Sequence, residues 1–376
     1  MGPISRYSRI EKLLGDLDIA KTSGLEIGAL ASPLLRPPRA NIRFVDHTDR
    51  ATLRAKYADD PNVPANEIVP VDAVWGESTL AECFPGESFD YVIASHVIEH
   101  VPDVIGWLDE IAAVLRPGGR LILAIPDRRY TYDVKRRETR LSDLIDAHLR
   151  GARRPTQGQV FDCKAHVVAF DHTEAWSASA SPDIAAPFVS SAYALAKALE
   201  SRDGAYVDCH CSVFTARSLL ALLDGLLELR LLPYRLDRFH VAPVGSNEMS
   251  LVLLRESEGA DRAAARSAIR VLLEQGVDSE GLALDTGFSN AREAEDPRIA
   301  PLRHALAEMQ ASTSWQITAP LRALGRWFRL IRRPRKTVLR GRGPTDREWP
   351  TAATPPWAAC SNETDICTGY PHELDH

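Results

Sequence analysis

Acidic residues stand at the ends of three consecutive strand-like segments near the N-terminus. Glu26 ends the first segment, Asp46 the second and Asp72 the third, and Gly28 follows Glu26 by two residues. An acid about twenty residues beyond the first strand can accept hydrogen bonds from both ribose hydroxyls of a nucleotide. Gly28 lets a ligand approach the backbone where a Cβ would collide. Each acid alone also fits a solvated loop, but the three together indicate a cofactor site.

Alternating strand-like and helix-like segments must bring these acids together. Parallel strands end at one edge of a sheet, and ligands bind at that edge. Short apolar runs predict buried parallel strands, and between them the pattern predicts helices over 48–58 and 103–115. The predicted strands are 24–27, 42–46, 67–71, 89–95 and 120–125. This alternation predicts an α/β fold with a parallel sheet covered by helices.

The later part of the chain predicts an extension of this sheet and several appended segments. A helix is expected over 215–229, and two strands at 234–243 and 248–255 form an antiparallel hairpin because the turn between them is short. The expected units are an N-terminal helix (1–20), a sheet domain (21–256) with a helical insertion (127–210), a helical extension (257–342) and a disordered tail (343–376).

Composition narrows the class of protein. The 376 residues are 45% hydrophobic and 26% charged, which excludes wholesale disorder and collagen-like structure. No apolar run reaches membrane-spanning length, and the first residues lack the pattern of a secretory signal. The six cysteines show no C-x-x-C spacing, so we expect reduced thiols and a cytoplasmic protein.

The net charge of −6 hides one basic segment. Residues 310–345 contain nine Arg and Lys and no Asp or Glu. A helix over 319–333 places Leu321, Trp327 and Phe328 on one face and arginines on the other, as a membrane-surface helix does. We expect residues 319–342 to meet an anionic membrane surface at the inner face of the membrane. A helix docked on its own domain or on a partner is the alternative, and the acidic remainder of the chain argues against nucleic acid.

Two further motifs resemble those of a known family. The segment 89–103 (FDYVIASHVIEHVPD) resembles the fourth-strand signature of class I S-adenosylmethionine-dependent methyltransferases of type 11, and 115–121 (LRPGGRL) resembles the turn before their fifth strand. The hairpin over 234–255 matches the end of their sheet. The resemblance implies a Rossmann-like sheet of seven strands with an antiparallel last strand, and S-adenosyl-L-methionine as cofactor.

The same resemblance implies roles for the residues at the sheet edge. Glu26 and Gly28 would lie by the methionine end of the cofactor, Asp46 by the ribose and Asp72 by the adenine. Ser95, together with His96, would border the transferable methyl group. The family's glycine-rich loop is reduced here to Gly28.

A narrower resemblance suggests the acceptor. Residues 124–133 and 208–215 are similar to bacterial methyltransferases found with surface-polysaccharide glycosyltransferases, and residues 312–322 resemble the tails of such glycosyltransferases. The resemblance implies a small-molecule or glycan acceptor, such as a lipid-linked glycan precursor, and glycosyltransferase partners.

Methyl transfer to a hydroxyl oxygen benefits from a general base. His96, Asp127 and His210 are the candidates, and His166 and His172 are further ones. His96 equally fits hydrogen bonding at the start of a helix, and a structural role fits His210 and His172 at least as well. No cluster has the spacing of a zinc site, so no metal is expected.

These observations favour an S-adenosylmethionine-dependent enzyme that methylates a hydroxyl group. A catalytically silent scaffold of a glycan-assembly complex is the alternative from another class, which the reduced glycine loop favours. A nicotinamide-dependent dehydrogenase would need a fuller G-x-G-x-x-G, which the sequence lacks.

Overall fold

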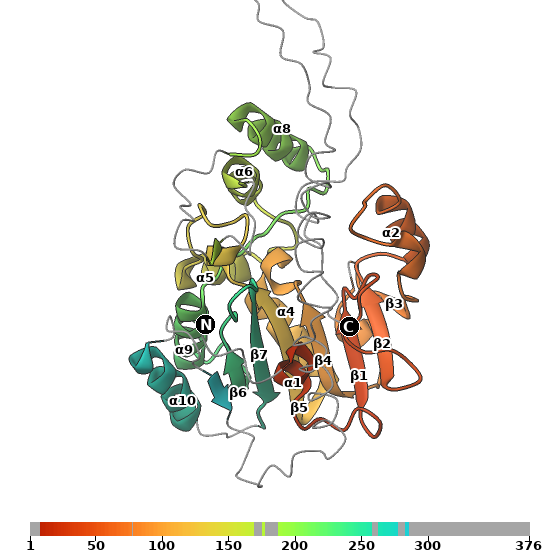
Figure 1. Cartoon of the computed structure of the whole chain (residues 1–376), viewed down its shortest axis with the longest axis vertical. Coiled ribbons are helices and arrows are strands. Elements are labelled where there is room, and N and C mark those ends of the chain that lie inside the picture. The colour runs from red at the N-terminus through yellow and green to blue at the C-terminus, as the bar shows by residue number, and fades with distance from the viewer. Residues whose placement is uncertain are drawn as a thin grey trace, which may run out of the picture. The chain divides into compact units, whose positions relative to one another are not determined.

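A single mixed sheet organises the described part of the chain. The computed structural model describes residues 8–76, 78–168, 175–176, 187–257, 262–276 and 283–285, and all of them belong to one compact unit. The strands follow the order β3-β2-β1-β4-β5-β7-β6-β8 (Figure 1). The order reverses direction between β1 and β4, which is where open α/β sheets bind ligands.

Parallel pairing fills one half of the sheet and antiparallel pairing the other. The parallel strands are β1 (Ser23–Ile27), β2 (Asn41–Asp46), β3 (Ala73–Val74), β4 (Phe89–Ser95) and β5 (Leu115–Pro126). The antiparallel pairs join β7 (Glu248–Arg255) to β5 and to β6 (Tyr234–His240), and β8 (Ala283–Asp285) to β6. The predicted seven-stranded sheet and its closing antiparallel hairpin are thus confirmed, and β8 adds an eighth strand at the edge.

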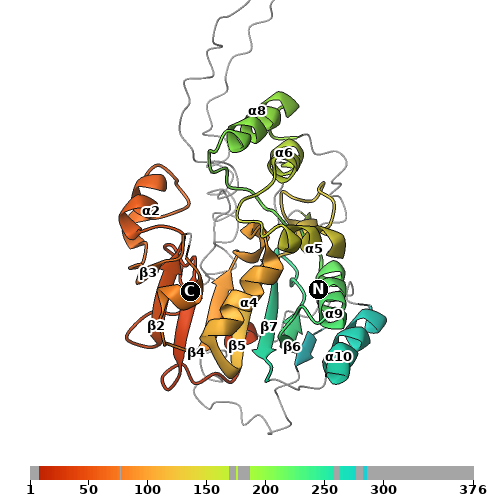
Figure 2. The same ribbon diagram turned by 180° about the vertical axis from the view of Figure 1, so that it is seen from behind.

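The two faces of the sheet carry separate apolar layers because side chains alternate along each strand. Val92 and Leu121 pack with α4 (Val104–Val114), α9 (Ala216–Glu228) and α10 (Arg262–Gln275). Figure 2 shows these three helices on one face. Ile93 and Ile122 face the other way and pack with Leu13 and Leu14 of α1 (Arg9–Leu14).

The third strand differs from the prediction. Residues 67–71 were predicted to be a strand, but Ala65–Glu67 form the 3-10 helix η1 and the strand begins only at Ala73. Buried Ile68 and Val69 pack in two separate clusters beside the sheet, which explains why their apolar pattern imitates a strand. Asp72 therefore stands before β3 and not at its end.

Helices outside the central layers complete the described residues. They are α2 (Arg50–Lys56), α3 (Leu80–Cys83), η2 (Ile98–His100), η3 (Arg128–Tyr130), α5 (Leu141–Leu149), α6 (Gln157–His166) and α8 (Ser191–Arg202). The predicted helical insertion 127–210 begins with η3, a stretch without helix and α5. In both views α6 and α8 lie beyond one edge of the sheet (Figures 1 and 2), and they pack on each other around Val160 and Ala198.

The expected units fit this arrangement in part. Helix α1 lies within the predicted N-terminal helix 1–20, and α5, α6 and α8 lie within the insertion 127–210. The basic helix 319–333 and the tail 343–376 fall outside the described residues. Within the described part of the chain, no helix is both long and apolar enough to span a membrane.

Candidate functional site

A large cleft opens at the edge of the sheet where β1, β2 and β4 end. Its volume is about 1710 Å³, and its lining includes Glu26, Gly28, Asp46, Ser95 and His96. Ligand sites usually occupy about 300–1,000 Å³, so this cleft has room for a cofactor and an acceptor together. The parallel strands therefore bring five of the predicted site residues to one cavity.

Glu26 is a buried carboxylate with one oxygen available to a ligand. Its side chain is 1% exposed, and the backbone N–H of Leu34 donates to Oε1 at 2.8 Å. Oε2 is buried and accepts no hydrogen bond from the described residues. Removal from water raises the pKa of Glu26 to about 7 against the opposing backbone donors of Leu34 and Leu35. A cationic group of a ligand at Oε2 would recover the ionised form.

Gly28 forms the tight turn that follows β1. Its φ is +68°, and an added Cβ would lie 3.1 Å from Cγ2 of Val97. Its N–H donates to the carbonyl of Val45 at 2.9 Å, which ties the turn to β2. Leu30 also has a positive φ, of 46°. A single glycine, Gly28, therefore lets a ligand come close to the backbone at this turn. Leu30 adopts a positive φ that is unfavourable for a residue with a side chain.

Asp46 reaches the cleft from the end of β2. Its side chain is 6% exposed, and Oδ1 accepts from the backbone N–H of His47 at 2.7 Å and lies 2.6 Å from His47 Nδ1. The His47 ring stacks on Tyr206 with centroids 6.3 Å apart. Tyr206 belongs to the insertion, so this segment covers the ribose end of the predicted cofactor site.

Asp72 is not among the residues that line the cleft. Its Oδ2 accepts from the N–H of Phe44 at 2.7 Å, and Oδ1 lies 3.6 Å from Nε of Arg43. These contacts fasten the start of β3 to β2, in keeping with the shifted strand. Trp75 and Gly76, which follow β3, line the cleft where the adenine-side acid was expected.

The N-terminal helix closes part of the cleft through Arg9. Its Nη2 donates to Oγ of Ser95 at 2.8 Å and to Glu248 at 2.9 Å, and Nε donates to Glu248 at 2.8 Å. Ser95 lines the cleft as predicted, but its hydroxyl is engaged by α1. Sequence reasoning missed Arg9 and Glu248 because 239 residues separate them.

His96 lies between two carboxylates at the tip of β4. Its Nε2 is 3.3 Å from Glu248 and its Nδ1 is 3.4 Å from Glu99. Burial opposes protonation, but Glu248 and Glu99 outweigh it and raise the pKa of His96 to about 9. The ring is therefore an imidazolium at neutral pH, a form that cannot accept a proton.

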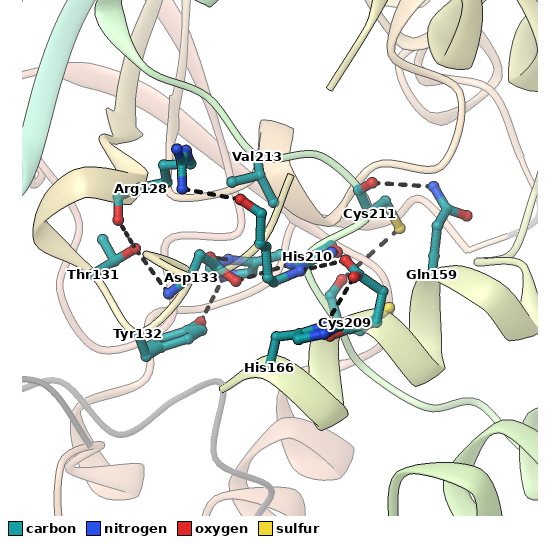
Figure 3. Close-up of polar contacts among 12 residues, drawn as sticks. Arg128, Thr131, Tyr132, Asp133, Gln159, His166, Cys209, His210, Cys211 and Val213 are labelled. Carbon is teal, nitrogen blue, oxygen red and sulfur yellow. Dashed lines mark hydrogen bonds and ion pairs between the residues drawn. The ribbon is translucent and has the colours of Figure 1, made fainter. Parts of the chain in front are cut away.

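His210 lies in a buried chain of hydrogen bonds. Figure 3 shows its ring between Tyr132 and Asp133. The Tyr132 hydroxyl is 2.8 Å from Nε2, and Asp133 Oδ2 is 2.5 Å from Nδ1. Arg136 donates to Asp133 at 2.9 Å and to the carbonyl of His210 at 2.9 Å. His210 and Tyr132 both line the cleft, so the ring is held in one orientation in the wall of the cleft.

A second carboxylate–histidine pair lies next to His210. Asp208 Oδ1 is 2.9 Å from Nδ1 of His100, and the rings of His100 and His210 meet edge to face with centroids 4.6 Å apart. Burial opposes protonation of His100, but Asp208 and Glu99 raise its pKa to about 10. The N–H groups of Cys211 and Ser212 donate to the carbonyl of Glu99 at 2.6 and 3.0 Å, which joins the two segments.

Two other predicted bases lie elsewhere. Asp127 is fully buried and absent from the lining of the cleft, and Nε and Nη2 of Arg129 hold its carboxylate at 3.0 and 2.7 Å. The backbone N–H of Arg129 also donates to Oδ1 of Asp127 at 3.0 Å, which makes Asp127 the N-cap of η3. His166 is on the exposed end of α6, bonded to the carbonyl of Asp162. His172 lies outside the described residues.

Sequence reasoning missed Asp133, Tyr132 and Asp208. Tyr132 and Asp133 fall in the predicted helical insertion, and the sequence assigned a role to neither of them. The signal available was the run Asp208-Cys209-His210-Cys211, in which an acid and a histidine alternate with apolar cysteines in an otherwise core-like segment.

Comparison with known proteins identifies the sheet domain. Residues 17–226, more than half of the chain, match a family described as a methyltransferase domain. A protein of Rhodopseudomonas palustris called ubiquinone biosynthesis O-methyltransferase is 42% identical over 108 residues, which cover 28% of this chain and 39% of that one. A protein of the same name from Paramagnetospirillum magneticum is 35% identical over 104 residues, which cover 27% of this chain and 36% of that one. The chain spans from about a fifth to two fifths of the length of its curated relatives.

Solved structures of low sequence identity also match. An S-adenosylmethionine-dependent methyltransferase from Mesorhizobium loti is 12% identical, with 63% of this chain and 93% of that one covered at a TM-score of 0.32. Magnesium protoporphyrin IX methyltransferase from Synechocystis PCC 6803, with bound SAH, is 12% identical, with 66% and 80% covered at a TM-score of 0.30.

The cleft fits S-adenosylmethionine. The buried Oε2 of Glu26, which accepts no hydrogen bond from the described residues, suits an ammonium group. The missing Cβ at Gly28 leaves space at the turn, and Asp46 offers a carboxylate to a ribose. The match over more than half of the chain shows that it belongs to the family described as a methyltransferase domain, and the order of the strands is that of a Rossmann-like methyltransferase fold.

Proposed function

We propose that the protein transfers the methyl group of S-adenosylmethionine to a hydroxyl oxygen of an acceptor that lies beside His210. The observation that carries this proposal is the Tyr132–His210–Asp133 chain in the wall of the cleft. A hydroxyl has a high pKa, so its oxygen becomes a good nucleophile only as its proton leaves. His210 is the group in this chain that can take the proton.

The chain's own residues divide the work of the reaction. The bound cofactor supplies a methyl group on a sulfonium, which is already a good leaving group. Glu26, Gly28 and Asp46 bind and orient the cofactor, and positioning of this kind removes much of the barrier. His210 accepts the hydroxyl proton at Nε2 once the Tyr132 hydroxyl has yielded that position to the acceptor.

Asp133 and Arg136 support His210 in this role. Asp133 accepts from Nδ1–H, which leaves the lone pair on Nε2, and it stabilises the imidazolium that forms. Burial disfavours the ionised form of Asp133, yet His210 and Arg136 hold the pKa of this carboxyl below its usual value. The carboxylate of Asp133 that supports His210 is therefore ionised at neutral pH. His96 contributes positive charge near the methyl group and no base.

Polar residues among those that line the cleft support a sugar-like acceptor. They include Asn62, Thr131, Arg154 and Asn247, whose side chains can hydrogen-bond to a hydroxyl group. Together with the resemblance to polysaccharide-associated methyltransferases, this favours a glycan or a lipid-linked glycan precursor. The curated relatives named for ubiquinone biosynthesis suggest a phenolic hydroxyl instead, and competition between the two acceptor classes separates these possibilities.

Two measurements test the proposal. Calorimetric titration with S-adenosylhomocysteine should show binding, and mass spectrometry of glycan and phenol mixtures incubated with labelled cofactor should show transfer to oxygen. His210→Gln should lower kcat by about 10²–10⁴-fold, the usual contribution of a general base, with cofactor affinity unchanged.

His148→Gln is the matched control, because His148 also pairs with an acid, Asp103 at 3.1 Å, but does not line the cleft. An unchanged kcat in His210→Gln contradicts the base. Cofactor binding without transfer to any acceptor favours the catalytically silent scaffold.

The basic segment supports a second proposal about location. Its nine positive charges near anionic lipid contribute about 1 kcal/mol each. Deletion of residues 321–342 should release the protein from vesicles that contain phosphatidylserine and leave cofactor binding intact. Sedimentation of the truncated protein with these vesicles contradicts this role.

A further inference from the structure

Three side chains in the cleft converge as metal ligands do. One ligand atom from each of Glu99, His100 and His210 lies within 4.8 Å of the other two. Among the described residues this is the one group of three or more His, Cys, Asp or Glu side chains with that spacing. Two imidazoles and one carboxylate are the ligands of a common class of catalytic zinc site, which keeps a fourth position for water or substrate.

Both histidines are oriented from behind by carboxylates. Asp208 holds Nδ1 of His100 at 2.9 Å and Asp133 holds Nδ1 of His210 at 2.5 Å. Histidines that bind metals nearly always donate their second N–H in this way, which fixes the ring. His100 would release its Nε2 proton as the metal binds. A general base needs one such pair, and this cleft has two.

Glu99 supplies an independent observation. Its side chain is 1% exposed, and neither of its carboxylate oxygens accepts a hydrogen bond from the described part of the chain. Its nearest ion-pair partner is His96 Nδ1 at 3.4 Å. The imidazolium of His96 offsets part of the cost of burying this carboxylate without hydrogen bonds, and a cation at the centre of the trio would bind its oxygens directly.

We infer that Glu99, His100 and His210 form a site for one divalent transition-metal ion, with zinc as the best match. Imidazole nitrogens favour zinc over the harder magnesium and calcium ions. Zinc bonds of about 2.0–2.2 Å require the three ligand atoms to close by about 1 Å. Binding also displaces the hydrogen bond from the Tyr132 hydroxyl to Nε2. The spacing rule applied to the sequence missed this site because its ligands are 110 residues apart.

This inference deepens the proposed function and rests on it for the identity of the acceptor. A cation in this position would hold the acceptor hydroxyl at its open coordination site and lower the pKa of that hydroxyl, so that its proton is released to solvent water before the oxygen takes the methyl group. The lone pair of His210 then binds the cation and does not take the proton. The two uses exclude each other, so experiment can distinguish them.

The test uses the full-length protein after treatment with a chelator. Calorimetric titration with zinc chloride and metal analysis after dialysis should show one zinc ion per chain. Glu99→Gln and His100→Gln should each weaken zinc binding at least about tenfold, and His148→Gln should not change it. Tyr132→Phe, which removes the competing hydroxyl, should bind zinc at least as tightly as the parent.

Cobalt substitution guards against binding by Cys209 and Cys211, which flank His210. The inferred ligands give no thiolate-to-cobalt absorption band, so such a band overturns the inference. The inference is also overturned if the protein does not bind zinc, or if His148→Gln weakens zinc binding as much as Glu99→Gln and His100→Gln do. Titration of the zinc-free protein with S-adenosylhomocysteine, in the presence of a chelator, measures cofactor binding independently of zinc binding. Transfer by the zinc-free enzyme at an unchanged rate rejects the cation and retains the proposed methyltransferase activity, whereas zinc binding without cofactor binding rejects the latter.

Discussion

The proposed cofactor end and the proposed acceptor end of the cleft are built in different ways. At the cofactor end, Glu26 and Asp46 follow regular parallel strands, and the backbone of those strands sets their positions. At the acceptor end, His100 and His210 lie outside the strands and are positioned by buried acids. The first end depends on sheet geometry, which many sequences can provide, and the second on a particular set of polar contacts.

This difference predicts where the protein tolerates change. A strand keeps its end in place when one side chain is altered, because its ladder of backbone hydrogen bonds remains. A buried network loses its geometry when one charge is removed, because its partner is then left unpaired in a low-dielectric environment. Substitutions at the acceptor end should therefore affect stability as well as activity.

The largest expected effect is at Asp133. Asp133→Ala leaves Arg136, which is 3% exposed, without its buried partner, so the free energy of unfolding should fall by about 3–5 kcal/mol. Asp162→Ala is the control, since this acid also pairs with Arg136, at 2.8 Å, but is 39% exposed. Its removal should lower the free energy by about 0–1 kcal/mol. Urea unfolding measures the free energy of unfolding of both variants. Similar decreases in the two variants would show that burial does not distinguish the Asp133–Arg136 pair from the Asp162–Arg136 pair.

A smaller effect is expected at the two acids of the cofactor end. Asp46→Ala should weaken binding of S-adenosylhomocysteine by about 1–3 kcal/mol, because ribose hydroxyls lose their acceptor. Asp72→Ala should leave affinity unchanged, since Asp72 is bonded to β2 away from the cleft. Calorimetry on both variants decides the assignment. Equal losses would return Asp72 to the cofactor site.

The pH dependence of binding should reveal Glu26. Because burial raises its pKa to about 7, the free protein favours the protonated form, and Glu26 costs stability as pH rises from 4.5 towards 7. A cationic ligand group favours the ionised form, so affinity for S-adenosylhomocysteine should fall by up to tenfold per pH unit below about 7. Titrations from pH 5.5 to 8 measure this, and Glu26→Gln should abolish the dependence. A dependence that persists in this variant belongs to another group.

The smallest effect is expected at the contact of α1 with the sheet. Arg9 is 41% exposed, so Arg9→Gln should change the free energy of unfolding by about 0–1 kcal/mol. The Arg9→Gln substitution should nevertheless speed dissociation of the cofactor, because Arg9 ties α1 to Ser95 and Glu248 across the cleft. Stopped-flow dissociation measures this rate. A rate equal to that of the parent would show that α1 does not retain the cofactor.

Sequence reasoning succeeded where structure is periodic. The strands that carry Glu26, Asp46 and Ser95 could be predicted because apolar runs and turn signals mark them. The prediction of the third strand was wrong because Ile68 and Val69 lie outside the strands but are buried, and so show the apolar pattern of a buried strand. Tyr132, Asp133 and Asp208 could not be assigned, because their roles depend on contacts between segments more than 70 residues apart.

The contact between Arg9 and Glu248 also bears on how the protein is made. Arg9 emerges early in synthesis, whereas Glu248 is the first residue of β7, so the ion pair that ties α1 across the cleft cannot form until β6 has been translated and β7 has begun. Fusion partners or cleavage at the N-terminus should accordingly alter access to the cavity more than alterations beyond β7 do.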